Sequence, residues 1–150
     1  MKKALILTLS MFMIVIQSLG QVNQPKYIAD ALKAYESGKY FEALPKLEAA
    51  YNKMTNKGKS ISEKGGMAYK VADCYRRMEQ FDKALQWYGS SIELRYYDVE
   101  PKVYYYHGEM LRMNGELAKA KDSYNNYKNK RGKDTSIDID AIISTCSEFN

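Results

Sequence analysis

The sequence is poor in the residues that most catalytic and metal sites need. Its 150 residues include one histidine, His107, and two cysteines, Cys74 and Cys146. A single histidine excludes a two-histidine zinc site. The sequence also lacks a Cys-x-x-Cys pair, a His-Glu-x-x-His motif, a glycine-rich phosphate loop and a serine elbow. We therefore expect no catalytic residues, no cofactor and no metal, and we expect a protein that is not an enzyme.

Proline and glycine are also scarce, and neither charge sign dominates. Three prolines and nine glycines exclude a collagen-like or low-complexity chain. Hydrophobic residues make up 45% and charged residues 27%, which is an ordinary globular balance for one domain. The net charge of +5 falls to +3 without residues 1–20, because Lys2 and Lys3 are the only charged residues there. This excess is too weak to imply nucleic-acid binding.

One largely apolar run is present, and it lies at the N-terminus. Two lysines precede Ala4–Ile16, and Ser18 and Gly20 are small residues at the −3 and −1 positions of a cleavage before Gln21. This is the layout of a secretory signal peptide. The alternative is an uncleaved membrane anchor, but a run of thirteen residues is shorter than the roughly 20 that span a bilayer. We expect residues 1–20 to be removed and the mature chain to be exported without spanning a membrane.

Export would permit a disulfide, and the chain has two cysteines. Cys74 and Cys146 lie far apart in sequence, on different predicted helices, so sequence alone does not decide whether they are bridged. We favour two buried free thiols, because free cysteine packs as a small hydrophobe.

After residue 24, apolar and small residues recur at three- and four-residue spacing, which predicts helices throughout. One pattern occurs three times: a polar turn, a large apolar residue, two polar residues and an alanine. It occupies Glu36–Leu44, Arg77–Leu85 and Met113–Lys121. The three alanines, Ala43, Ala84 and Ala120, are 41 and 36 residues apart.

Each copy of this pattern ends one predicted helix and begins another. The first helices are expected over about 25–36, 61–78 and 100–113, and the second over about 40–54, 81–94 and 117–130. A helix pair of this kind cannot bury its apolar face alone, so we expect an all-α solenoid of three stacked repeats. The repeats would span about 24–57, 61–98 and 99–134 within a domain over 21–150. A capping helix over about 137–149 would follow, with Ile139, Ile142, Ile143, Cys146 and Phe149 on its apolar face.

Two local signals concern helix starts. Ser60 and Glu63 have the spacing of a capping box, which predicts the start of the third helix. Pro45 predicts an irregularity in the second helix, or a helix that begins near Phe41.

These residues resemble the tetratricopeptide repeat (TPR), a unit of about 34 residues with a large–Leu–small–Tyr–Ala–aromatic–Ala pattern. The second unit supplies Val71, Ala72, Tyr75, Ala84, Tyr88 and Ser91. The third supplies Tyr104, Gly108, Leu111, Ala120 and Tyr124, and the first supplies Tyr27, Ala31, Ala34, Ala43, Leu47 and Ala50. The chain departs from the pattern at Asp30, His107 and Tyr127. The resemblance covers about 24–134 and implies a helical solenoid that binds other proteins.

A narrower resemblance is to the N-terminal TPR domain of Bacteroidetes envelope proteins, which continue into a β-propeller and an OmpA-like domain. The leader and the segments 31–40, 71–76 and 104–111 carry it. Some of those proteins belong to the type IX secretion and gliding machinery. The resemblance implies an exported protein in the periplasm, or at the periplasmic face of the outer membrane, with an envelope or secretion-machinery protein as partner.

The inner helices of TPR proteins line a groove that receives a peptide or a helix. The resemblance assigns this groove to Ile28, Leu32, Tyr35, Tyr69, Asp73, Arg76, Tyr105, Glu109 and Arg112. We expect a protein-interaction scaffold. The alternatives are a self-associating architectural subunit of the envelope and a carrier of a small ligand or peptide.

Two further readings concern residues 96–107. The tyrosines at 96–97, at the end of the second unit, and at 104–106, in the third, have the composition of a base-stacking platform, but export and the weak net charge disfavour nucleic acid. We expect His107 to be a packed, structural histidine rather than a catalytic one.

Overall fold

The computed structural model of the chain describes residues 25–58 and 60–148. The expected leader and the expected first mature residue, Gln21, lie outside the described residues. The described part contains seven α-helices, one 3₁₀ helix and no strand. The elements are α2 (Lys26–Glu36), α3 (Tyr40–Lys53), α4 (Ser60–Arg77), α5 (Phe81–Glu93), η1 (Tyr96–Asp98), α6 (Lys102–Met113), α7 (Leu117–Lys130) and α8 (Ile139–Glu148).

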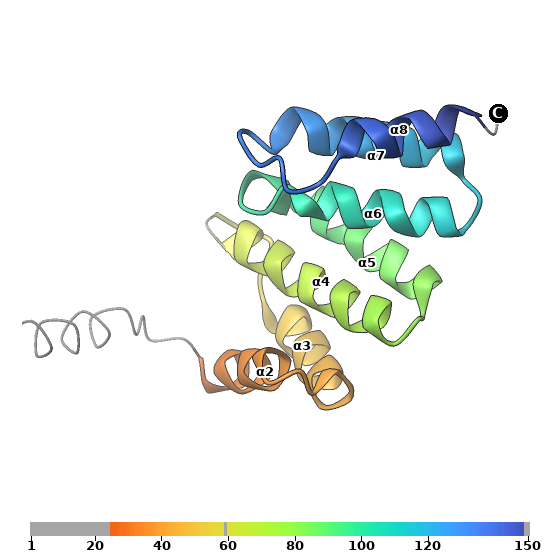
Figure 1. The fold of residues 1–150 in the computed structure, drawn as a ribbon. Coiled ribbons are helices and arrows are strands. Elements are labelled where there is room, and N and C mark those ends of the chain that lie inside the picture. Colours follow the sequence, from red (N-terminus) through yellow and green to blue (C-terminus); the bar gives the residue numbers. More distant parts are fainter. Residues whose placement is uncertain (1–24, 59, 149–150) are drawn as a thin grey trace, which may run out of the picture.

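The helices form three helix–turn–helix pairs, α2 with α3, α4 with α5 and α6 with α7 (Figure 1). Each helix packs on the next one along the chain, and α8 packs on α7 at the end of the stack. The fold is therefore the expected all-α TPR solenoid of three repeats with a C-terminal capping helix. The six repeat helices begin and end within two residues of their predicted bounds. Phe149, predicted on the capping helix, lies outside the described residues.

The same hydrogen bond closes the turn inside every pair. The backbone N–H groups of Lys39, Gln80 and Glu116 donate to carbonyl oxygens five residues earlier, at 3.1, 2.9 and 2.9 Å. This hydrogen bond is typical of the Schellman motif at a helix C-terminus, which requires one residue in the left-handed backbone conformation. Gly38 and Gly115 supply it with φ of 72° and 76°, while Glu79 adopts a φ of 58° in the second unit. Because the same turn recurs in each pair, the sequence alone predicts where these helices end.

Two local expectations meet different outcomes. Helix α4 begins at Ser60, but the Ser60 hydroxyl donates to the carbonyl oxygens of Lys57 and Thr55, at 2.5 and 3.1 Å. The predicted helix start is therefore confirmed, but the capping box itself does not form, because the hydrogen bonds of Ser60 Oγ lead to the preceding connection and not to the Glu63 N–H. Helix α3 begins at Tyr40 and continues through Pro45. Pro45 is the sixth residue of α3, beyond the first turn, so its missing N–H removes the hydrogen bond that a regular helix would make to the Phe41 carbonyl. The predicted helix start near Phe41 is confirmed to within one residue.

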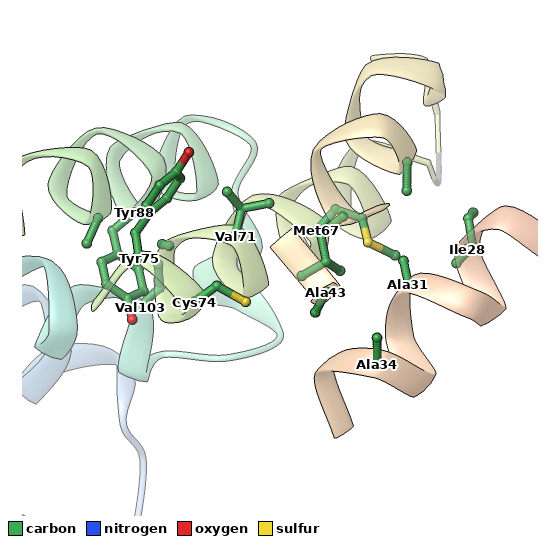
Figure 2. Close-up of a cluster of buried hydrophobic side chains, with 14 of the residues drawn as sticks. Ile28, Ala31, Ala34, Ala43, Met67, Val71, Cys74, Tyr75, Tyr88 and Val103 are labelled. Atoms are coloured by element: carbon green, nitrogen blue, oxygen red, sulfur yellow. The ribbon is translucent and has the colours of Figure 1, made fainter. Parts of the chain in front are cut away.

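The repeated alanines are fully buried within the stack. Ala43, Ala84 and Ala120 have no exposed surface. Because alanine has no side chain beyond Cβ, the backbones of two helices approach closely there, and larger side chains fill the space around them. Figure 2 shows this arrangement around Ala43, with Met67 and Val71 among the neighbouring buried side chains.

The connection between α5 and α6 is held against the start of α4 by two glycines. A Cβ at Gly65 would lie 2.9 Å from Tyr96 Cβ, and a Cβ at Gly66 would lie 3.0 Å from the Tyr96 ring. The Ser91 hydroxyl also donates to the Gly65 carbonyl, at 2.9 Å. The glycines therefore let η1, in the connection between the second and third units, lie directly on α4.

Both cysteines are buried and free, which confirms the favoured reading. Burial raises the pKa of Cys74 to about 12, so its thiol stays protonated at neutral pH. Among the described residues, no helix combines the length and apolar character needed to cross a bilayer.

The alanine contact gives a test of the stack. We expect Ala84→Leu to lower the free energy of unfolding by about 1–3 kcal/mol, because the contact has no room for a larger side chain. Urea denaturation followed by circular dichroism measures the change. Lys83→Leu is the matched control on the neighbouring exposed position and should change stability by less than about 0.5 kcal/mol. Equal losses at the two positions would contradict this packing.

Candidate functional site

Two adjoining pockets lie along the inner helices. The first, of about 310 Å³, lies between the end of α4 and α6, and includes Arg76 and Arg77 in its wall. The second, also about 310 Å³, lies between α6 and α8, and includes Arg112 and Ile142. Tyr105 and Glu109 line both pockets, so the two pockets belong to one surface. We call this surface the inner groove. Its lining residues are Arg76, Arg77, Glu79, Phe81, Tyr105, Tyr106, Glu109, Met110, Arg112, Met113, Ala141, Ile142 and Thr145.

A buried carboxylate organises the α4 side of the groove. Asp73 is only 3% exposed, and its Oδ2 accepts hydrogen bonds from Tyr35 Oη on α2, at 2.8 Å, and Arg77 Nε, at 2.7 Å. Its Oδ1 accepts hydrogen bonds from Arg76 Nε, at 3.1 Å, and Arg76 Nη2. Burial alone raises the pKa of Asp73, but the hydrogen bonds from Arg77, Arg76 and Tyr35 outweigh it and hold the pKa below its ordinary value. Asp73 is therefore ionised, and it fixes two arginines and the first repeat.

Arg76 is held from several directions. Besides its bonds to Asp73, its Nε donates to Tyr88 Oη at 3.3 Å, and its guanidinium lies 4.5 Å from the centre of the Tyr106 ring. Such a cation–π contact fixes the plane of the guanidinium. An arginine held through its Nε–Nη2 edge keeps the N–H groups of Nη1 for another acceptor. Arg76 therefore presents donors to the groove in a fixed orientation.

The third repeat carries a similar acid–arginine pair on α6, with a tyrosine of α7 beside it. Arg112 Nε and Nη2 donate to the two carboxylate oxygens of Glu109, at 3.4 and 3.1 Å, and Tyr124 Oη donates to Glu109 at 2.5 Å. Gly108 makes room for that tyrosine, because a Cβ there would lie 2.6 Å from its ring. The groups are less buried here than around Asp73, since 43% of the Arg112 side chain is exposed.

The two constellations are related by the repeat. Tyr69, Asp73, Arg76 and Tyr88 in the second unit correspond to Tyr105, Glu109, Arg112 and Tyr124 in the third, each 36 residues later. The repeat spacing thus places two arginines, each braced by an acidic residue three positions earlier, on neighbouring inner helices.

Tyrosine rings form a continuous layer beneath and beside the arginines. Tyr69 contacts Tyr88, Tyr96 and Tyr106, with ring centres 5.6–6.3 Å apart. Tyr105 contacts Tyr106, with ring centres 5.2 Å apart, and also packs on two tyrosines of α7. Because edge-to-face and offset rings pack tightly, this layer gives the groove a rigid wall.

The structure brings together only some of the predicted groove residues. Tyr105, Glu109, Arg76 and Arg112 line the inner groove. Asp73 lies beneath it as an anchor, and the half-buried Tyr69 supports it from the side. The first unit contributes less: Tyr35 bonds to Asp73, while Ile28 is buried in the core and Leu32 packs against it.

Sequence reasoning missed several groove residues. Arg77 follows Arg76 directly and lies four residues after Asp73, the spacing of a helical ion pair, so a charge-pair search finds it. Tyr106 gave no comparable signal. On α8, Ile142 was expected only to cap the stack, and Ala141 and Thr145 were given no role, yet all three line the second pocket.

His107 is packed and hydrogen-bonded, as expected. Its Nδ1 lies 3.0 Å from Ser123 Oγ, and Ser123 Oγ donates to the carbonyl of Tyr104 at 2.9 Å. Burial lowers the pKa of His107, and the nearby charge of Glu116 opposes that shift only in part. Within residues 25–58 and 60–148, no group of three or more His, Cys, Asp or Glu side chains is placed to hold a metal ion.

Comparison with solved structures gives similarities in fold. The chain superposes on the type III secretion translocator chaperone SycD of Yersinia enterocolitica with a TM-score of 0.65 and 17% identity, covering 86% of this chain and 90% of SycD. SycD in complex with a peptide of the translocator YopD gives a TM-score of 0.59 and 20% identity, covering 82% and 88%. PcrH in complex with the chaperone-binding region of PopD gives 0.60 and 14%, covering 83% and 85%. No family model matches the sequence, and no curated protein matches it either.

The buried carboxylate gives a test with a defined pH dependence. The pKa of Asp73 is lower in the folded protein than in the unfolded chain, so its stabilisation is complete above about pH 4 and is lost as the pH falls through the folded-state pKa. We expect Asp73→Asn to lower the free energy of unfolding at pH 7 by about 1.5–3 kcal/mol, because it weakens hydrogen bonds to charged groups. As the pH is lowered into the acid range, the free energy of unfolding should fall less for the variant than for the wild type.

Urea denaturation at a series of pH values measures both effects. Asp30→Asn, at an exposed position of α2, is the control and should behave like the wild type. If both variants lose the same stability, Asp73 is not the anchor of the groove.

Proposed function

We propose that the protein is a non-enzymatic interaction module whose inner groove binds an extended segment or a helix of a partner protein. One observation carries the proposal. Two repeat-related arginines, each braced by an acidic residue, border a continuous groove built from three helices. Tyrosine and arginine are the residue types that most often dominate binding energy at protein interfaces.

The bracing favours binding because it removes an entropy cost. Arg76 is already fixed by Asp73 and Tyr106, and Arg112 by Glu109, so little rotamer freedom remains to be lost when a partner binds. Their remaining N–H groups suit carboxylates or backbone carbonyl oxygens of the partner. The proposal is also supported by SycD and PcrH, which share the fold and whose structures include translocator segments.

We further propose that the chain is exported and works in the envelope of a Gram-negative bacterium, in the periplasm or at the periplasmic face of the outer membrane. The signal-peptide layout of residues 1–20 supports export. The resemblance of segments 31–40, 71–76 and 104–111 to Bacteroidetes envelope proteins supports a partner in the envelope or its secretion machinery, with type IX secretion or gliding as the narrower proposal.

Processing tests the proposed export. We expect the mature chain to begin at Gln21, because cleavage there follows the small residues Ser18 and Gly20. Intact-mass spectrometry of the protein from the periplasmic fraction measures the start directly. Retention of residues 1–20 in the membrane fraction would indicate an anchor, and an uncleaved chain in the cytoplasmic fraction would contradict export.

Truncation of the groove tests the proposed binding. We expect the double variant Tyr105→Ala, Arg112→Ala to bind peptides that occupy the inner groove more weakly, by about 2 kcal/mol or more, because both side chains line the groove. The peptides come from a displayed random-peptide library, and calorimetry measures their affinity. Binding to acidic peptides should weaken as salt rises. Tyr69 is less suitable because it does not line the groove, and Arg76 is less suitable because it also holds the buried Asp73.

Lys83→Ala with Lys119→Ala is the matched control. These exposed lysines lie 36 residues apart on α5 and α7, and the inner groove does not include them. The control should bind like the wild type, and circular dichroism should show both double variants folded. A folded groove variant that keeps the wild-type affinity would contradict the proposal.

A further inference from the structure

A second pocket lies outside the inner groove and shares no lining residue with it. It has a volume of about 580 Å³ and opens between α5 and α7, with α6 at its base. We call it the outer pocket. Its lining residues are Leu85, Ile92, Tyr104, His107, Leu111, Glu116, Lys119, Asp122, Ser123 and Asn126. This volume is within the usual range of ligand-binding pockets.

The preceding repeat shows what fills the equivalent space. Between α3 and α5, Tyr51 and Trp87 meet edge to face, with ring centres 4.9 Å apart. The corresponding residues one repeat later are Ile92 and Ser123, at the 41- and 36-residue spacings of the chain. A serine thus stands where the second unit has an indole ring. The outer pocket is the space that this substitution leaves between the next two helices.

One large residue of the third unit does not fill this space. Tyr104 stands where the second unit has Ala68, and it lines the outer pocket. Its ring stacks on Tyr97 in η1, with ring centres 5.2 Å apart and planes 27° from parallel. Tyr104 is therefore held at the side of the pocket.

A histidine at the base gives the pocket a hydrogen-bond acceptor. The Tyr104 carbonyl can only accept, so the Ser123 hydroxyl proton points to it, and Ser123 must in turn accept from His107 Nδ1–H. This fixes the tautomer and leaves the lone pair on Nε2. Nε2 forms no hydrogen bond within the described part of the chain, and it is not fully enclosed by protein atoms. Because His107 lines the outer pocket, we place this free acceptor at the pocket surface.

The rim of the pocket is negatively charged. Lys119 is paired with Glu116, while the exposed Asp122 forms no ion pair with any described residue. One negative charge is therefore uncompensated beside the opening. It complements a positively charged neighbour of the bound group and disfavours a carboxylate.

We propose that the outer pocket binds a tryptophan side chain of a protein partner, with the indole N–H donated to His107 Nε2 and a basic neighbour of that tryptophan near Asp122. The indole takes the place that Trp87 occupies in the preceding repeat. The site is a second interaction surface, separate from the inner groove and independent of what the groove binds.

Titration with single amino-acid probes tests this site. N-acetyl-L-tryptophanamide should shift the NMR signals of His107 and Ser123 saturably, and N-acetyl-L-alaninamide should not. N-acetyl-L-phenylalaninamide should bind at least about threefold more weakly, because it has no N–H to donate from its ring. L-Tryptophanamide, which carries a positive charge, should bind more tightly than the acetylated probe, and Asp122→Asn should abolish that difference.

Variants taken from the preceding repeat distinguish this site from nonspecific binding. Ser123→Trp and Ile92→Tyr restore the residues that fill the equivalent space, so each should reduce binding at least about tenfold. Both variants are tested, so that one still fills the pocket if the other does not fold. His107→Val, the residue of the second unit, should erase the preference for tryptophan over phenylalanine.

Tyr105→Ala is the control for the inner groove and should leave probe binding unchanged. The proposal is overturned if the tryptophan probe shifts no NMR signal of the pocket. It is also overturned if Ser123→Trp or Ile92→Tyr folds and still binds the probe with the wild-type affinity. It is also overturned if free indole binds while the capped amino acid does not, because the pocket would then take a small molecule rather than a side chain. None of these outcomes bears on the inner groove.

Discussion

The close approach of neighbouring helices at small residues is the constraint on which the molecule depends. Ala43, Ala84 and Ala120 are completely buried at equivalent places in the three pairs. Each pair has an apolar face that it cannot bury by itself, and small buried residues let neighbouring helices pack closely enough to bury it. Gly108 extends the same logic, since its missing Cβ admits the Tyr124 ring.

The inner groove is held in place by residues that are also part of the packed interior. Asp73 is buried like a core residue, yet each of its hydrogen bonds goes to a side chain that reaches toward the surface. A buried carboxylate is tolerated only when it is paired, and the arginines that pair with it become fixed in the process. Stability and binding geometry therefore share the same bonds. The Glu109–Arg112 pair repeats the design in a more exposed setting, where it contributes less to stability.

Differences between the repeats carry as much functional information as their similarities. The inner face keeps its tyrosine, acid and arginine from the second unit to the third. The outer face does not, because Tyr51 and Trp87 give way to Ile92 and Ser123. The fold tolerates this because each repeat is stabilised by contacts with its neighbours, so an unfilled surface between two outer helices need not disrupt the stack.

The sequence alone determined the helices, their turns and the stacking alanines, because these follow from local periodicity and from backbone preferences within a few residues. The resemblance to TPR proteins also assigned Tyr105, Glu109 and Arg112 to the groove, and the helical period places these three on one side of α6. The tertiary structure decided the rest. Tyr35 meets Asp73, and the lining residues of α8 face α6, only because of how distant helices are placed. The outer pocket depends on side-chain volumes summed over three helices, and no local pattern encodes that sum.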